Sequence, residues 1–113
     1  MAKTNGLDTP SRNSLGNGTT VKGEIESNGD FRIDGTLIGT IKTKGKVVIG
    51  STGTVDGEIY CQNADIEGEA KAQIQVKELL TIKSNAKITG DISTGKLAIE
   101  SGAQFSGTCK MGA

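Results

Sequence analysis

The sequence predicts an all-β fold, a right-handed parallel β-helix (solenoid) of about six windings. The main observation is a short pattern that returns along most of the chain, with Val21, Leu37 and Val55 beginning copies 16 and 18 residues apart. Apolar and polar residues alternate inside each copy, which is the period of a β-strand. A repeat of this length with strand periodicity is typical of a solenoid.

Composition agrees with a thin coil. Only 3 % of the 113 residues are aromatic, whereas 17 are glycine. A sandwich or an α/β core needs large side chains at its centre, but a narrow lumen is filled by Ile, Val, Leu and Ala. The single proline, Pro10, lies before the repeats, where it breaks no ladder of hydrogen bonds. We therefore predict one β-helix over residues 19–110, with short disordered tails at residues 1–18 and 111–113.

Each copy contains two strand-like elements separated by a polar corner. The first element has the form apolar–x–Gly–x–apolar, and the second has the form apolar–x–apolar. About 17 residues return the chain to a position parallel to the previous strand, and such crossovers are right-handed in ~98 % of cases. The first elements are 21–25, 37–41, 55–59, 72–76, 88–92 and 105–109, and the second are 31–33, 47–49, 64–66, 80–82 and 97–99.

The side chains that point into the lumen should share one parity along the chain. Odd positions are apolar from Val21 to Ile59, even positions from Ala64 to Ile92, and odd positions again from Leu97. The parity therefore changes near residues 62–63 and again near residues 94–95. Single-residue bulges at polar corners would produce both changes.

Glycine recurs at the centre of the first element, as in Gly23, Gly39 and Gly57. In this alignment Ile74 takes that place in the fourth copy. The position then does not require a positive φ, so we attribute the glycines to tight packing at a bend. The same alignment predicts two outward columns, one through Glu24, Thr40, Glu58, Gln75, Asp91 and Thr108, and one through Glu26, Lys42, Tyr60, Lys77, Ser93 and Lys110.

The two cysteines belong to different copies. Cys61 falls at a corner of the third copy and Cys109 on the inner track of the sixth. Strands stacked ~4.8 Å apart place them roughly 14 Å from each other, beyond the ~7 Å limit between Cα atoms for a disulfide. We expect two free thiols, with Cys109 buried as a small hydrophobe.

The composition argues against several classes of function. The chain contains no histidine, and its acids do not cluster, so we predict no enzyme activity, no metal site and no cofactor. A net charge of zero gives no reason to expect nucleic acid as a partner. No segment approaches the ~20 apolar residues of a membrane span, and no signal peptide is recognisable, so we expect a cytoplasmic protein. The threonines do not form the single ladder of an ice-binding face.

Over residues 19–110 the chain resembles the bactofilins, a family of bacterial cytoskeletal proteins, in its six windings, its period and its V/L-x-G-x-I elements. The resemblance implies a homopolymer of β-helices joined end to end without nucleotide, in non-polar filaments where like ends meet. It also implies a scaffold at the inner face of the cytoplasmic membrane, with a cell-wall hydrolase or an inner-membrane protein as partner. The start Met1-Ala2-Lys3-Thr4 departs from the apolar membrane-targeting sequence that many members carry.

The ends of the coil are the candidate functional surfaces. The first and last windings of a solenoid leave backbone groups and apolar lumen without a neighbour. The pattern stops close to Ala113, so we expect no large cap at the C-terminal end. The predicted polymerisation interfaces are Ile99, Phe105 and Cys109 at the C-terminal end, and Val21 and Ile25 at the N-terminal end. Ile38 and Val48 are apolar residues on the outward track, and we expect a lateral or partner contact there. The alternative is a β-helical binding module that does not polymerise.

Overall fold

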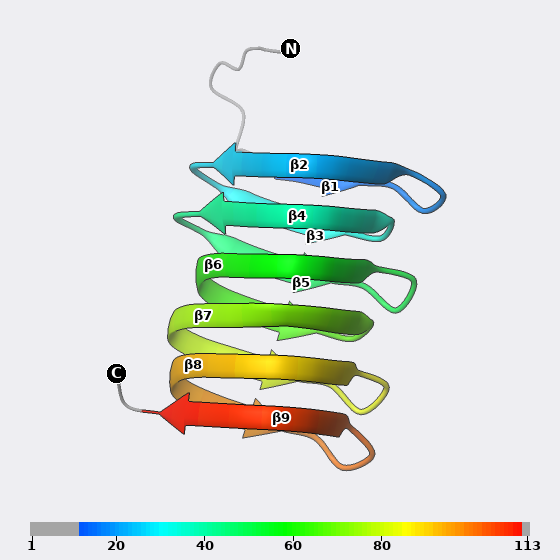
Figure 1. Cartoon of the computed structure of the whole chain (residues 1–113). Helices are drawn as coiled ribbons and strands as arrows, with labels where there is room; N and C mark the ends of the chain where they lie inside the picture. Colours follow the sequence, from blue (N-terminus) through cyan, green and yellow to red (C-terminus); the bar gives the residue numbers. More distant parts are fainter. Residues whose placement is uncertain (1–11, 112–113) are drawn as a thin grey trace.

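A computed structural model describes residues 12–111 as a single parallel β-helix (Figure 1). Going down the stack from the N-terminal end, the chain turns clockwise, so the helix is right-handed as predicted. All described strand pairs are parallel. The strands are β1 (Arg12–Leu15), β2 (Thr20–Ser27), β3 (Asp30–Ile33), β4 (Thr36–Thr43), β5 (Lys46–Ile49), β6 (Thr54–Ile66), β7 (Glu69–Ile82), β8 (Lys87–Ile99) and β9 (Gln104–Met111).

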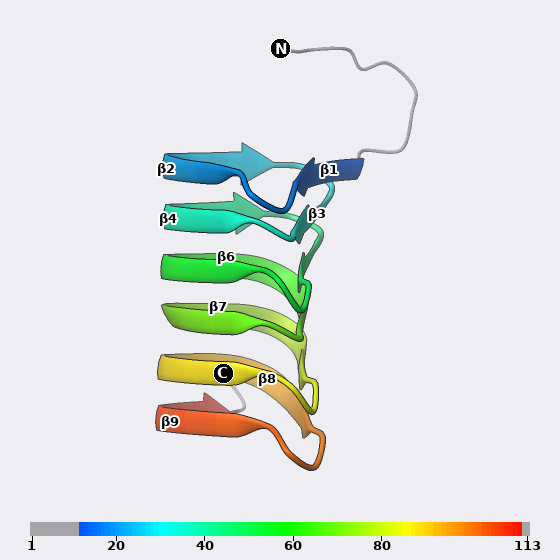
Figure 2. The ribbon, with the colours of Figure 1, turned by 90° about the vertical axis from the view of Figure 1, so that its right-hand side faces the viewer.

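Each coil consists of a short arm of about four residues followed by a long arm of about eight. The short arms stack as one ladder and the long arms as another (Figure 2). In β6, β7 and β8 the strand continues around the corner, so that one strand supplies a long arm and the next short arm. The pairings define six coils: 12–27, 30–43, 46–61, 63–76, 79–94 and 96–111.

The β-helix begins earlier than the expected boundary at residue 19. Strand β1 pairs with β3, with Asn13 opposite Phe31 and Leu15 opposite Ile33. Part of the segment predicted as a disordered tail is therefore the first short arm. At the other end, β9 extends to Met111, the first residue of the predicted C-terminal tail. Residues 1–11 and 112–113 of the predicted tails lie outside the described residues.

The core is a column of aliphatic side chains along the axis. Its fully buried members contain no aromatic residue, in agreement with the narrow lumen that the composition predicted. Phe31 and Phe105 are half-buried and pack against this core from the second and the last coil. The largest fully buried side chains are Ile33, Leu37, Ile41, Val47, Ile49, Val55, Ile59, Ile66, Ile74, Leu80, Ile82 and Ile88.

The glycines at the centre of each long arm form a column that needs both a positive φ and the absence of a side chain. Gly39 and Gly57 have φ of 141° and 144°, which is unfavourable for other residues. A Cβ at Gly57 would overlap the carbonyl oxygen of Gly39 on the coil above. The residue of the fourth coil in this column is Ala72, which pairs with Gly57 and has no positive φ. The predicted place of Ile74 in this column was wrong, and with it the inference that packing alone explains the glycines.

Corner length sets where the parity changes. The corner between a long arm and the next short arm has two residues at 28–29, 44–45 and 77–78, but one at Gln62 and one at Gly95. The register accordingly shifts between Cys61 and Asn63, near the first predicted change of parity. The second irregularity lies within β7, between Val76 and Leu79, where two residues oppose the single Gly95 of β8.

The pairing of β6 with β7 corrects the predicted outward columns. Gln73 pairs with Glu58, and Gln75 pairs with Tyr60. The sequence pattern predicted Gln75 next to Glu58 and Lys77 next to Tyr60, and both of these positions are two residues too far along the chain. Lys77 is instead a corner residue, and it lines a groove on the side of the coil.

Candidate assembly surfaces at the two ends

The C-terminal face is the open side of the last coil, formed by β9 and by residues 96–99 of β8. Strand β9 pairs with β8 on one side and has no described partner strand on the other. Its eight residues therefore present an unpaired edge, and natural proteins usually cover or charge such an edge. This edge surrounds the cross-section of the lumen.

Apolar side chains are exposed on this face because no further coil covers them. Ile99 is 53 % exposed and Met111 is 54 % exposed. Phe105 is half-buried, since it rests on Ile88 of the coil above. Cys109 is exposed in the same row. The structure thus places all three predicted residues, Ile99, Phe105 and Cys109, on one end face of the coil.

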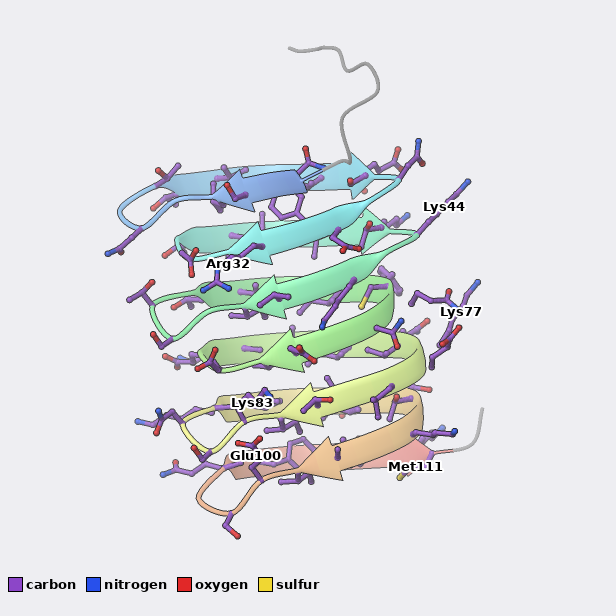
Figure 3. The ribbon with its side chains drawn as sticks, turned by 180° about the vertical axis from the view of Figure 1, so that it is seen from behind. Arg32, Lys44, Lys77, Lys83, Glu100 and Met111 are labelled. Carbon is purple, nitrogen blue, oxygen red and sulfur yellow. The ribbon has the colours of Figure 1, made fainter. Side chains whose placement is uncertain are left out.

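Met111 was missed by the sequence analysis. It pairs with Thr94, whose side chain is buried, and so occupies the inner track (Figure 3). The pattern itself contained the signal, because Met111 follows Phe105, Gly107 and Cys109 at the same spacing of two residues. Its assignment to a tail hid this continuation.

The N-terminal face is less apolar. Val21 and Ile25, the two residues predicted for this face, are half-buried on β2. Beside them Asn13 occupies the inner track above Phe31 and donates a hydrogen bond of 2.9 Å to Ser27 Oγ. This polar pair joins the short arm to the far end of the long arm in the first coil. Sequence reasoning missed it because residues 12–18 had been assigned to the tail.

The residues predicted for a lateral contact do not share a strand ladder. Ile38 is 40 % exposed on the long arm β4, which pairs with β2 and β6. Val48 is half-buried on the short arm β5, which pairs with β3 and β6. The two side chains belong to different arms of the coil, so they form no common patch.

The environments of the two cysteines differ from the prediction, which placed Cys61 at a corner and Cys109 in the core. Cys61 is buried at 5 % exposure, and burial raises the pKa of its thiol to about 12. Cys109 is exposed, since its place on the inner track of the last coil has no neighbour below. Both thiols are free, as expected.

Other kinds of site find little support in the described part of the chain. Residues 12–111 contain no group of three or more His, Cys, Asp or Glu side chains that could hold a metal ion. The same residues form no helix that is long and apolar enough to cross a membrane. The exposed ends of the coil remain the most distinctive surfaces for a functional contact.

Comparison with protein families identifies the chain. The model of the bactofilin family, described as polymer-forming and cytoskeletal, matches residues 13–110. The protein belongs to the bactofilin family. The match begins within β1, in agreement with the early start of the β-helix seen in the structure.

Two curated bactofilins of Myxococcus xanthus (strain DK1622) are similar to this one. BacO is 30 % identical over 97 residues, which cover 86 % of this chain and 77 % of BacO. BacP is 22 % identical over 98 residues, covering 87 % of this chain but 41 % of BacP. The chain thus spans less than half the length of BacP.

Two solved structures of Thermus thermophilus bactofilin share the fold. A cryo-EM reconstruction of its double helical filaments has a TM-score of 0.84 and 32 % identity, covering 88 % of this chain and 99 % of that one. A crystal structure of a phenylalanine-to-arginine mutant has a TM-score of 0.75 and 30 % identity, covering 80 % and 100 %. These likenesses agree with a self-assembling cytoskeletal role for the family fold.

Proposed function

We propose that this bactofilin forms filaments by end-to-end contact of its β-helix, without nucleotide, and that Ile99, Phe105 and Cys109 lie in the contact at the C-terminal end. The observation that carries the proposal is the exposure of Ile99 and Met111 beside Phe105, on a coil whose strand edge is unpaired. Burying a large apolar side chain contributes ~1.5–3 kcal/mol. Several such side chains on one face favour association of two copies.

The C-terminal face can meet a copy of itself. The inner-track residues of β9 are placed symmetrically about Gly107, with Phe105 two residues before it and Cys109 two residues after it. If β9 pairs antiparallel with its copy about a two-fold axis through Gly107, Phe105 lies opposite the copy's Cys109. Each bulky ring then packs on a small side chain. This complementarity supports contact between like ends, and hence filaments without polarity.

The N-terminal end would supply the second contact of the filament, through Val21 and Ile25. Its side chains also suit a like-end contact, because Lys22 and Glu24 flank Gly23. An antiparallel pairing about Gly23 places Lys22 of one copy opposite Glu24 of the other, and opposite charges on facing strands are favourable.

A charge placed on the C-terminal face tests end-to-end assembly. Phe105→Arg should prevent the sedimentation of polymer and the appearance of filaments by negative-stain microscopy without nucleotide. Thr89→Arg is the matched control, since it adds the same charge to an exposed position on the side of β8. The proposal fails if Phe105→Arg polymerises like the control. A wild-type protein that stays monomeric would instead favour a binding module that does not polymerise.

Disulfide trapping tests which ends meet. In a Cys109→Ser background, Ser106→Cys and Thr108→Cys chains are mixed, because these residues face each other about Gly107 in the like-end contact. Facing residues have Cα atoms ~4.5–5.5 Å apart, within reach of a disulfide. In head-to-tail stacking Ser106 would instead lie next to Lys22 of the next copy. A covalent dimer of Ser106→Cys with Lys22→Cys, and not with Thr108→Cys, would overturn the non-polar arrangement.

The cellular role that we propose is a scaffold in the cytoplasm, at the inner face of the membrane, that supports cell shape or positions a cell-wall hydrolase or an inner-membrane protein. Support comes from membership of a cytoskeletal family and from a fold that leaves the sides of the coil open when its ends are occupied. Fluorescent fusion to the chain tests this role. Diffuse signal in cells, with no structure along the envelope, would contradict it.

A further inference from the structure

A groove lies on the side of the coil, at the point where a one-residue corner is stacked between two longer corners. The third coil turns through Gln62 alone, whereas the second turns through Lys44 and Gly45 and the fourth through Lys77 and Glu78. The longer corners carry their first residues outward on either side of Gln62. Figure 3 shows Lys44 and Lys77 projecting from the same edge of the coil.

The groove formed there runs along the axis over the first four coils and carries an excess of positive charge. Three lysines and one glutamate line it, although the net charge of the whole chain is zero. Its lining residues are Glu26, Ser27, Asn28, Lys42, Thr43, Lys44, Tyr60, Cys61, Gln62 and Lys77.

The lysines of the groove are not neutralised by acids within the described chain. The ion pairs among the side chains of residues 13–111 are Arg32–Asp34, Lys46–Asp65 and Lys83–Glu100, and none of them contains Lys42, Lys44 or Lys77. These three ammonium groups are therefore available to an external anion.

Two carboxylates that border the groove have other partners. Tyr60 Oη donates a hydrogen bond to Glu58, and Gln62 Nε2 donates one to Glu78. The bond to Glu58 raises the pKa of Tyr60, so the phenol stays neutral at physiological pH. Lys42 lies over the ring of Tyr60, with its Nζ 5.8 Å from the ring centroid. The aromatic ring thus positions one cation of the groove.

We propose that this groove binds an extended acidic segment of a partner protein. The excess of lysines provides charge complementarity, and the open, elongated shape suits a chain rather than a compact ligand. Four coils spaced ~4.8 Å apart extend over roughly 14 Å, which is the length of four to five extended residues. The lining residues include none of β8 or β9, so contact at the C-terminal end leaves the groove accessible. The inference does not depend on end-to-end assembly.

The test uses a fluorescein-labelled decaglutamate peptide as the probe, with fluorescence anisotropy at low ionic strength. Lys42→Gln/Lys44→Gln/Lys77→Gln removes the three cations of the groove. Lys71→Gln/Lys83→Gln/Lys87→Gln removes the same charge from β7, from β8 and from the turn between them, at positions that do not line the groove. All six positions have exposed or partly exposed side chains, so both variants should fold, which circular dichroism checks.

We expect the peptide to bind the wild type, the groove variant to bind at least ~10-fold more weakly, and the control to stay within about twofold. Added salt should weaken binding, because the contact is electrostatic and solvent-exposed. Equal losses in both variants would show attraction by general charge and overturn the proposal. Binding to vesicles containing phosphatidylserine but not to decaglutamate, with the same dependence on the three lysines, would overturn it in favour of a lipid surface.

Discussion

Asn13 and Ser27 close the N-terminal coil with a hydrogen bond of 2.9 Å between Asn13 Nδ2 and Ser27 Oγ. Ser27 Oγ also accepts a hydrogen bond from the backbone N–H of Gly29, so the pair is tied to the first corner. At the opposite end the equivalent inner positions carry Leu97 and Met111, which are apolar. The two ends of the coil therefore differ in polarity, and we expect the N-terminal contact to be the weaker one.

Replacing the polar pair should strengthen association at the N-terminal end. Asn13→Leu places an apolar side chain over Phe31 and adds an exposed apolar surface that a second copy can bury. We expect polymer to form at about 10-fold lower protein concentration, which corresponds to about 1.4 kcal/mol. Light scattering against concentration measures this. Asn85→Leu, in an exposed turn on the side of the coil, is the control and should leave the threshold unchanged.

The two thiols should report assembly directly. Cys109 is exposed on the end face, whereas Cys61 is buried with a raised pKa and carries almost no reactive thiolate at neutral pH. A thiol reagent should therefore modify Cys109 quickly in dilute protein and slowly in polymer, and Cys61 only after unfolding. Mass spectrometry after a short pulse identifies the modified residue. Equal labelling of Cys109 in dilute protein and in polymer would place the contact elsewhere.

The buried thiol should also make stability depend on alkaline pH. Burial raises the pKa of Cys61 from an ordinary value of 9.0 to about 12, so the folded state retains a proton that the unfolded state releases. The contribution is intact below pH ~9 and is lost as the pH rises toward 12, at up to about 1.4 kcal/mol per unit. Urea unfolding of wild type and Cys61→Ala at pH 8 and 10 measures the difference. A pH dependence that is the same in both proteins would contradict this expectation.

The glycine column offers a matched pair of substitutions. Gly57→Ala forces an unfavourable φ and an overlap with the carbonyl oxygen of Gly39, so we expect a loss of at least ~2 kcal/mol. Ala72→Gly at the next coil should cost only about 0.5–1 kcal/mol, since the backbone there is already ordinary. Urea unfolding in the Phe105→Arg background separates these effects from assembly. If Gly57→Ala lowers the free energy of unfolding no more than Ala72→Gly does, the column tolerates a side chain at any coil.

The fold was predictable because its signal is repeated. Alternating apolar residues such as Ile33, Ile49 and Ile66 mark the same inner position in successive coils, and all three are fully buried. The first short arm was not predictable in this way. Its sequence RNSL contains only Leu15 as an apolar residue, and Asn13 stands where later coils have Phe31 or Val47. A polar end coil lacks the alternation that identified the others.

The fourth copy was misaligned for a different reason. In β7 the long arm is apolar at every second residue from Ala70 to Val76, so two alignments shifted by two residues fit the pattern equally well. Only the pairing of Gly57 with Ala72 decides between them. Among the predicted site residues, the end-face positions followed from chain order alone. The solvent exposure of Cys109 and Cys61 could not be predicted in this way, because it depends on whether a further coil covers each residue.

Within residues 12–111, extensive contacts join only strands of the same or adjacent coils. No residue in the middle of the stack therefore depends on the total number of coils, and stability accumulates from one neighbour to the next. A duplication or deletion of one complete middle coil would change the length of the rod by ~4.8 Å and leave both termini chemically intact. The length of such a subunit can thus change in evolution by one coil at a time, independently of the surfaces that join one subunit to another.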